Sequence, residues 1–277
     1  MTQLIGYQSV LDCGVVSASS VDPQYPVANI SDWLPHDFWS AAAAGVVTVD
    51  VDCGSAVEVD YLAIGRHNLG KADTSYVLQY SADGVFFSDC FSQQVAVSDA
   101  TIMVQFQAVS AQFFRLRMDS VSPVLIGLLA VGKALRLPGP YPGFQPPRLN
   151  VKRNSVVNIS NNGVPVSSLA TAKGASFSIE AKWLHESVVS SDVEPFVYAA
   201  RARVFFYAWF YENHPSDVVV AWFDGVPDMR YPAFSRVDVR LKCVSMVEAE
   251  DNSPACAPIE PVGGGLIGPG EEPVGPT

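Results

Sequence analysis

Alternation of apolar and polar residues with a period of two is the feature that most constrains this fold. Val47, Val49 and Val51 alternate with polar residues in the first half of the chain. Val237 and Val239 open a second run of this kind, with charged residues between the apolar ones. A period of two puts successive side chains on opposite faces of a strand, so one face is buried and the other is polar. The two runs predict half-buried strands in both halves of the chain.

Shorter runs with strand character recur between turn-forming residues. In the first half we expect strands at 59–66, 76–81, 102–107, 113–118 and 124–131. In the second half we expect them at 156–160, 176–181, 204–211, 218–223 and 236–246. One short helix is expected between Asp192 and Arg203, capped by Ser191, because Val193, Phe196, Val197 and Ala200 form an apolar stripe. The predicted fold class is mainly β, with a sandwich or barrel first and a second β-rich domain carrying one short helix.

A proline-rich segment divides the chain. Residues 137–147 hold five prolines and so lack the N–H groups that a regular ladder of hydrogen bonds needs. We therefore predict an N-terminal sandwich at 1–136, a linker at 137–148 and a β-rich oligomerisation domain at 149–248. Residues 249–277 are predicted to be an acidic tail or arm, because their Pro/Gly-rich composition buries too little to offset the entropy of ordering.

Charge and cysteine content exclude several classes of function. The net charge is −11, made up of −8 over residues 1–135, +3 over 136–247 and −6 over 248–277. A surface that neutralises phosphates needs gathered basic residues, so a nucleic-acid partner is not expected. We expect no membrane span and no signal peptide at the N terminus, and we interpret the five scattered cysteines as reduced thiols. The acidic first part beside a mildly basic second part favours contact between domains or head-to-tail packing of copies.

Several short motifs follow one another over residues 5–135. They are YPVANISD at 25–32, WS at 39–40, VDVDCG at 49–54, VDYLAIG at 59–65, YVLQYSADG at 76–84, FFRLR at 113–117 and a closing strand at 126–132. Their order and spacing resemble the discoidin family, also called the F5/8 type C or galactose-binding-like domain. The resemblance implies a jelly-roll sandwich whose loops carry the ligand. Unlike the secreted members of the family, this sequence has no pair of cysteines joining the two ends of the domain.

The second half is similar to distal-tail or tail-tip proteins of long-tailed bacteriophages. The residues that carry this similarity are VFFYAWFY at 204–211, HPSDVVVAWFDG at 214–225 and the strand that ends in VSMVE at 244–248. The similarity implies a virion component, assembled in the host cytoplasm, that forms a homo-oligomeric ring around the tail axis and contacts other tail proteins.

Candidate ligand-binding residues occur in two groups, one before the first strong strand and one after the next strand. Sugars are held by aromatic faces together with planar polar groups, and in the discoidin family the corresponding loops carry ligand. The alternative is that Trp39 belongs to the core and the others are solvated loop residues. The candidates are Trp33, His36, Asp37, Trp39, Arg66, His67 and Asn68.

Metal and catalytic signals are sparse. Asn29 and Asp32 could contribute oxygens to a Ca²⁺ site, as that loop does in some relatives, but no other cofactor is expected. His185 and Glu186 begin a zinc-protease motif that ends in Val189, so the second imidazole is missing. Glycines 263, 265 and 268 have dinucleotide-motif spacing but follow no predicted strand. We predict no enzymatic activity.

The aromatic strand at 204–211 has large side chains on both faces, so both must be covered, either by the chain itself or by a neighbouring subunit. The candidate interface residues are Phe205, Tyr207, Trp209, Tyr211 and Trp222. Our leading hypothesis is a phage-tail ring protein whose discoidin-like domain supports neighbouring proteins or contacts host-surface glycans. The alternative is a free-standing carbohydrate-binding module or an accessory domain of a glycan-active enzyme.

Overall fold

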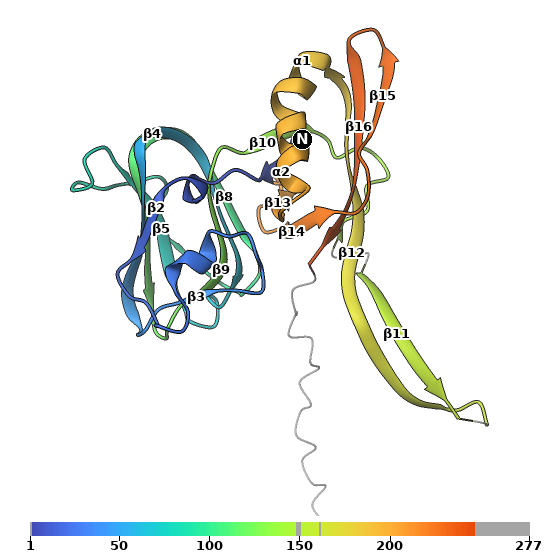
Figure 1. Cartoon of the computed structure of the whole chain (residues 1–277), viewed down its shortest axis with the longest axis horizontal. Helices are drawn as coiled ribbons and strands as arrows, with labels where there is room; N and C mark the ends of the chain where they lie inside the picture. The colour runs from blue at the N-terminus through green and yellow to red at the C-terminus, as the bar shows by residue number, and fades with distance from the viewer. Residues whose placement is uncertain (1, 148–150, 161, 247–277) are drawn as a thin grey trace, which may run out of the picture. The chain divides into compact units, whose positions relative to one another are not determined.

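The computed structural model describes residues 2–147, 151–160 and 162–246 and is mainly β, as predicted (Figure 1). Its helical parts are two 3₁₀ turns, η1 (Val10–Asp12) and η2 (Val27–Ile30), and a continuous segment made of α1 (Glu186–Val188), a π-helical turn (Val189–Val193) and α2 (Glu194–Ala200). The predicted tail at 249–277, which includes the three glycines of dinucleotide-motif spacing, lies outside the described residues. The strands are β1 (Thr2–Gly6), β2 (Val15–Ala18), β3 (Trp39–Ser40), β4 (Gly45–His67), β5 (Ser75–Ser81), β6 (Ser88–Asp89), β7 (Gln94–Val95), β8 (Ile102–Ser120), β9 (Leu125–Gly132), β10 (Leu135–Pro138), β11 (Val151–Ile159), β12 (Pro165–His185), β13 (Phe205–Ala208), β14 (Val218–Phe223), β15 (Asp228–Ala233) and β16 (Arg236–Ser245).

Strands from the first half form a sandwich from one sheet that folds over itself. Its strand order is β3-β9-β4-β8-β5-β6, with β2 paired to β4 and β7 paired to β5. The long strands β4 and β8 bend and take part in both layers. The first part of β4 pairs with β2 and its last part with β9, while β8 follows β4 along most of its length. The predicted strands at 59–66 and 113–118 are therefore parts of longer strands, because backbone pairing continues through the bends.

The second sheet contains the N-terminal strand. Its order is β10-β1-β13-β14-β16-β12-β11, with β15 paired to β16. In β1, Thr2 lies opposite Pro138 of β10, and Ile5 lies opposite Tyr207 of β13. The sandwich is thus inserted between two neighbouring strands of this sheet. Residues 2–6 fall within the sandwich domain that we predicted at 1–136, but they pair in the second sheet. Pairing between segments this far apart leaves no local pattern in a sequence. The domain boundaries themselves remain a prediction.

The helical segment begins earlier than the sequence predicts. We expected Ser191 to cap a helix, but the first helical residue is Glu186, and the backbone N–H of Ser187 donates to the side chain of His185. The apolar stripe also continues one turn upstream to Val189, which is buried. The expected cap at Ser191 is therefore wrong, although α2 lies within the expected bounds of 192–203. The imidazole nitrogen of His185 provides a cap that standard capping rules do not include.

The two sheets pack against each other through a shared apolar cluster. Leu4 of β1, Tyr61 of β4 and Phe206 of β13 are all fully buried in it. A Cβ built on Gly65 would lie 2.9 Å from a methyl carbon of Val220, so the absence of a side chain at Gly65 permits the close approach. Within the described residues, no helix has the length and apolar character that crossing a membrane requires.

Candidate functional site

Strand β9 brings together the two groups of candidate ligand residues. Trp39 in β3 lies opposite Ile126 of β9, and His67 at the end of β4 lies opposite the same residue from the other side. The segment before Trp39 and the segment after β4 therefore meet beside β9. The sequence nominates both segments, and the sheet order juxtaposes them.

A glycine in β9 allows the two segments to come close. A Cβ built on Gly127 would lie 2.9 Å from the Cβ of Arg66 and 3.1 Å from the backbone oxygen of Asp37. Both separations are shorter than ordinary van der Waals contact between such atoms. The bare backbone of Gly127 is therefore what permits Arg66 and Asp37 to lie next to each other.

Three of the candidate side chains are available to a ligand at this place. The side chains of His36 and Asp37 are 71% and 45% exposed, with 3.5 Å between the imidazole Nε2 and the carboxylate Oδ2. Arg66 is exposed and has a φ of 54°, a left-handed conformation that costs a non-glycine residue on the order of 1 kcal/mol. Together these side chains present an imidazole, a carboxylate and a guanidinium, which are planar groups able to hydrogen bond with hydroxyls.

Three other candidates have structural partners. Trp39 is fully buried, and its indole N–H donates to the carbonyl of Ser20 at 3.2 Å. The side chain of Asn68 donates to the carbonyl of Pro123 at 3.0 Å and accepts from the backbone N–H of Leu125 at 2.7 Å. Trp39 therefore belongs to the core, as the alternative interpretation had it. His67 is buried as well, so it is not the solvated loop residue of that alternative, and both His67 and Asn68 anchor the loops.

His67 is held as a neutral imidazole. Its Nδ1 accepts from the backbone N–H of Leu69 at 3.2 Å, so Nε2 carries the proton and donates to the carbonyl of Ala100 at 2.8 Å. Burial lowers the pKa of His67 to about 4, although the bond to Ala100 acts in the opposite direction. His67 therefore fixes the loop that follows β4 in one geometry.

Trp33 lies at the contact between the two sheets. Its indole N–H donates to the carboxylate of Asp12 at 2.6 Å, and the guanidinium of Arg203 stacks 4.6 Å from its ring centre. Trp33 is 6% exposed, and its ring packs against Phe206 of β13. The ring that we expected to offer a face to ligand therefore has its surface covered by the second sheet.

The two candidate metal ligands have protein partners of their own. The amide nitrogen of Asn29 donates to the carbonyl of Phe38 at 3.0 Å, and Asp32 accepts from the backbone N–H of Leu34 at 2.8 Å. In the part of the chain that the structure describes, no group of three or more His, Cys, Asp or Glu side chains is placed to hold a metal ion. The Ca²⁺ site stays a prediction.

The candidate interface residues differ in their surroundings. Phe205, Tyr207 and Trp209 are at most 1% exposed on one face, and Phe206 and Ala208 are fully buried on the other, so the chain itself covers both faces of this strand. The hydroxyl of Tyr211 accepts from the backbone N–H of Gln105 in the sandwich at 2.7 Å. Trp222 is 36% exposed and is the member of the set most open to solvent. The interface assignment stays a prediction.

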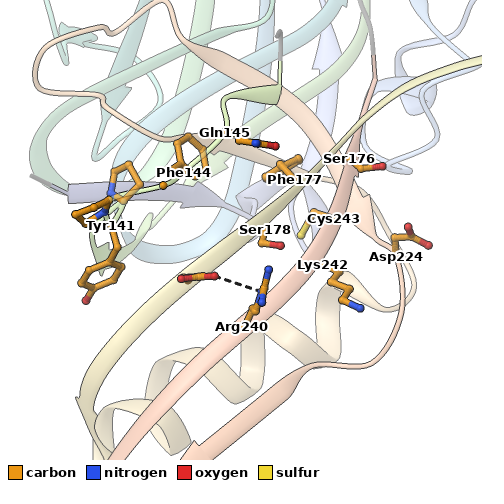
Figure 2. A pocket seen from close by; sticks show the side chains of 14 residues that line it. Tyr141, Phe144, Gln145, Ser176, Phe177, Ser178, Asp224, Arg240, Lys242 and Cys243 are labelled. Atoms are coloured by element: carbon orange, nitrogen blue, oxygen red, sulfur yellow. Dashed lines mark ion pairs between the residues drawn. The ribbon is translucent and has the colours of Figure 1, made fainter. Parts of the chain in front are cut away.

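A groove that the sequence does not predict lies on the second sheet (Figure 2). It has a volume of about 530 Å³ and lies between the proline-rich segment and the outward faces of β12 and β16. Glu180 lies opposite Arg240, and Ser178 lies opposite Lys242, so these side chains form a polar floor. The alternation in β16 shows which side chains point outward, but it gives no sign that the proline-rich segment covers them.

Comparisons with known proteins identify the sandwich. Residues 15–127 match the model of the F5/8 type C domain, so the N-terminal half carries a discoidin-like domain. No curated protein matches the chain.

Solved structures similar to the chain include two carbohydrate-binding modules. One is chitosan-binding module 1 of a chitosanase/glucanase from Paenibacillus sp. IK-5, with 18% identity, a TM-score of 0.38, and coverage of 45% of this chain and 98% of the module. The other is a module from Clostridium perfringens in complex with GalNAc-β-1,3-galactose, with 16% identity, a TM-score of 0.40, and coverage of 45% and 99%. A putative α-L-fucosidase from Bacteroides thetaiotaomicron matches with 19% identity and a TM-score of 0.39 over 46% of this chain, which spans 28% of the fucosidase.

Proposed function

Residues 15–127 match the F5/8 type C domain, and on this basis we propose that the protein binds carbohydrate. The proposed site is the end of the sandwich that carries His36, Asp37 and Arg66. The observation that supports the proposal most directly is the joint exposure of these three planar polar groups around Gly127. Their backbone is fixed by buried neighbours, so little ordering is needed when a ligand binds. The ligand class we propose is a neutral glycan of a cell surface.

The test is binding of the full chain to an array of neutral and acidic glycans, followed by titration with the best ligand. Replacing Arg66 by alanine removes the guanidinium and is expected to weaken binding about tenfold or more. Lys133→Ala is the matched control, because it also removes one exposed cation from the N-terminal half. Equal binding by Arg66→Ala and Lys133→Ala would show that the site is elsewhere.

We also propose that copies of the chain assemble through the second sheet into a ring of the bacteriophage-tail type, without catalytic activity of their own. The supporting observation is β15, a strand whose every residue is exposed and which carries Tyr231 at 65% exposure. Phe234, in the turn that follows, is 98% exposed. Unpaired strand edges and clustered apolar side chains are typical of contact surfaces between subunits.

The mass of the purified chain in solution and electron micrographs test the assembly proposal. A ring is expected at micromolar concentration, and Phe234→Ser together with Tyr231→Ser should lower the mass toward that of one chain. Val97→Ser is the control, because it removes another highly exposed apolar side chain, from the sandwich. A monomer at all accessible concentrations would contradict assembly but leave glycan binding untouched.

A further inference from the structure

The groove on the second sheet has a floor of balanced charge. Its floor and one end carry two basic side chains, Arg240 and Lys242, and two acidic ones, Glu180 and Asp224. The guanidinium Nε of Arg240 lies 3.3 Å from a carboxylate oxygen of Glu180, the ion pair drawn in Figure 2. A strongly ionic ligand would find no net charge to attract it, and an apolar ligand would strip water from these groups without replacing their hydrogen bonds.

The same floor suits a ligand that is rich in hydroxyl groups. The carboxylates of Glu180 and Asp224 accept hydrogen bonds, and Arg240 and Lys242 donate them, so each hydroxyl can meet a partner of either kind. The small side chain of Ser178 stands beside Lys242 and leaves depth on the floor. Glu180 is already fixed by its ion pair with Arg240, so its oxygens are oriented before a ligand arrives.

The opposite wall is aromatic and rigid. The hydroxyl of Tyr141 accepts from the backbone N–H of Lys182 at 3.0 Å and donates to its carbonyl at 3.2 Å. Phe144 packs edge-on against Phe210 with ring centres 6.4 Å apart. Pro140 and Pro142 limit the backbone of this wall further. Ordering this wall therefore needs little free energy on binding.

From the balanced polar floor, the fixed aromatic wall and the volume of the groove, we propose a second carbohydrate-binding site on the second sheet. The groove takes one or two neutral sugar rings, which place their hydroxyls on the floor and their C–H faces against Tyr141 and Phe144. Its volume of about 530 Å³ lies within the range of small-molecule sites. The groove stands independently of the sandwich site, and with both sites one chain could hold two points of a glycan.

The experiment is an NMR titration of the full, isotope-labelled chain with N,N′-diacetylchitobiose, lactose and cellobiose. At least one of these neutral disaccharides should shift the backbone amide signals of Ser178, Lys242 and Gln145 in a saturable way. Ser178→Trp fills the groove from its solvent side and should weaken this response at least about tenfold. Arg240→Gln, which removes the cation but keeps a planar amide, is a second variant that perturbs the strands less.

Arg66→Ala separates the two sites, because it should leave the groove signals responding as before. If none of the three sugars shifts the groove signals up to tens of millimolar, or if the shifts persist unchanged in both groove variants, the proposal is wrong. Signals around Gly127 that respond to sugar while the groove is silent would refute this second site and leave the proposed function standing. The reverse pattern would support the groove and refute the sandwich site.

Discussion

At the scale of single residues, a buried glutamine joins four strands of the second sheet. Gln3 in β1 is fully buried, and its amide nitrogen donates to the carbonyls of Pro138 at 2.8 Å and Glu180 at 2.9 Å. Its side-chain oxygen accepts from the hydroxyl of Tyr207 at 2.6 Å. Burial raises the pKa of Tyr207 well above its ordinary value, so the hydroxyl remains a donor at all ordinary pH values. Every polar atom of the Gln3 side chain is thereby satisfied.

The first prediction is that the losses in free energy of unfolding caused by Gln3→Leu and Tyr207→Phe are not additive. Tyr207→Phe leaves the oxygen of Gln3 unpaired, which should lower the free energy of unfolding by about 1–3 kcal/mol. Gln3→Leu should cost more, because it leaves two carbonyls and a hydroxyl without this partner. The double variant should cost less than the sum, as urea unfolding of all four proteins would measure. Gln24→Leu, at an exposed position, is the control and should change little.

The second prediction concerns the pH dependence of stability at His67. The pKa of His67 is about 4 in the folded chain and 6.5 for a free imidazole, so unfolding takes up a proton between these values. The contribution of neutral, buried His67 to the free energy of unfolding is fully present above pH 6.5. It is lost as the pH falls toward 4, and the loss is roughly 3 kcal/mol. Urea unfolding at several pH values should show that the free energy of unfolding declines less steeply with falling pH in His67→Gln than in the natural chain. Identical slopes would refute this role.

At the scale of elements, strand β9 positions the proposed sandwich site through a missing side chain. The third prediction is that Gly127→Ala weakens glycan binding, because a Cβ there would press on Arg66 and on the backbone of Asp37. Stability should fall by about 1–3 kcal/mol as the neighbouring loop shifts. Gly6→Ala is a matched control, since its Cβ would meet the ring of Tyr61 away from the site. Calorimetric titration should find glycan affinity lowered in Gly127→Ala alone.

Elements governed by local patterns are those that the sequence predicts best. The alternation from Val47 to Val51 predicts the buried face of β4 correctly, because a period of two can be recognised from residues that are adjacent in the sequence. The strand at 218–223 is predicted to the residue. The start of the helix is missed because His185 caps it. Trp183 in β12 has a φ of 59° and interrupts the register with β16, and a bulge of this kind is set by tertiary contacts.

The candidate site was predictable only in part, for the same reason. Sequence nominates both segments, but the distinction between exposed Arg66 and buried His67 depends on which way each side chain points after β4 bends. Trp33 is covered by Phe206 and Arg203, residues that lie far along the chain. Long-range contacts of this kind leave no signal in one sequence. The groove is missed for the same reason, since its wall and floor come from distant segments.

At the scale of the whole described chain, a cation links the sandwich to the second sheet. The guanidinium of Arg203 pairs with Asp12 at 2.8 Å, donates to the carbonyl of Tyr7 at 2.8 Å and stacks on Trp33. Asp12 is also bonded by Trp33, so both partners of the ion pair are held in place. Both charged side chains are about three-quarters buried, which limits screening by solvent.

The fourth prediction is that Arg203→Met lowers the free energy of unfolding by about 2 kcal/mol, because it removes the cation that pairs with Asp12 and the donor to the carbonyl of Tyr7. Arg230→Met is the control, since it breaks an ion pair with Asp228 that is largely exposed and should leave stability unchanged. Thermal unfolding of both variants measures the difference. An equal loss of stability in the two variants would mean that burial of the Arg203–Asp12 ion pair does not increase its contribution to the free energy of unfolding.

Insertion of the sandwich between β1 and β10 sets the order in which the molecule can be completed during synthesis. Strand β1 precedes the sandwich in the chain, so it meets β10 only after the whole sandwich has been made, and meets β13 later still. The sandwich can close while the remainder is being translated, and its closure carries Thr2 and Pro138 toward each other. Closure of the sandwich thus reduces the loop-closure entropy that must be lost when β1 pairs with the rest of the second sheet.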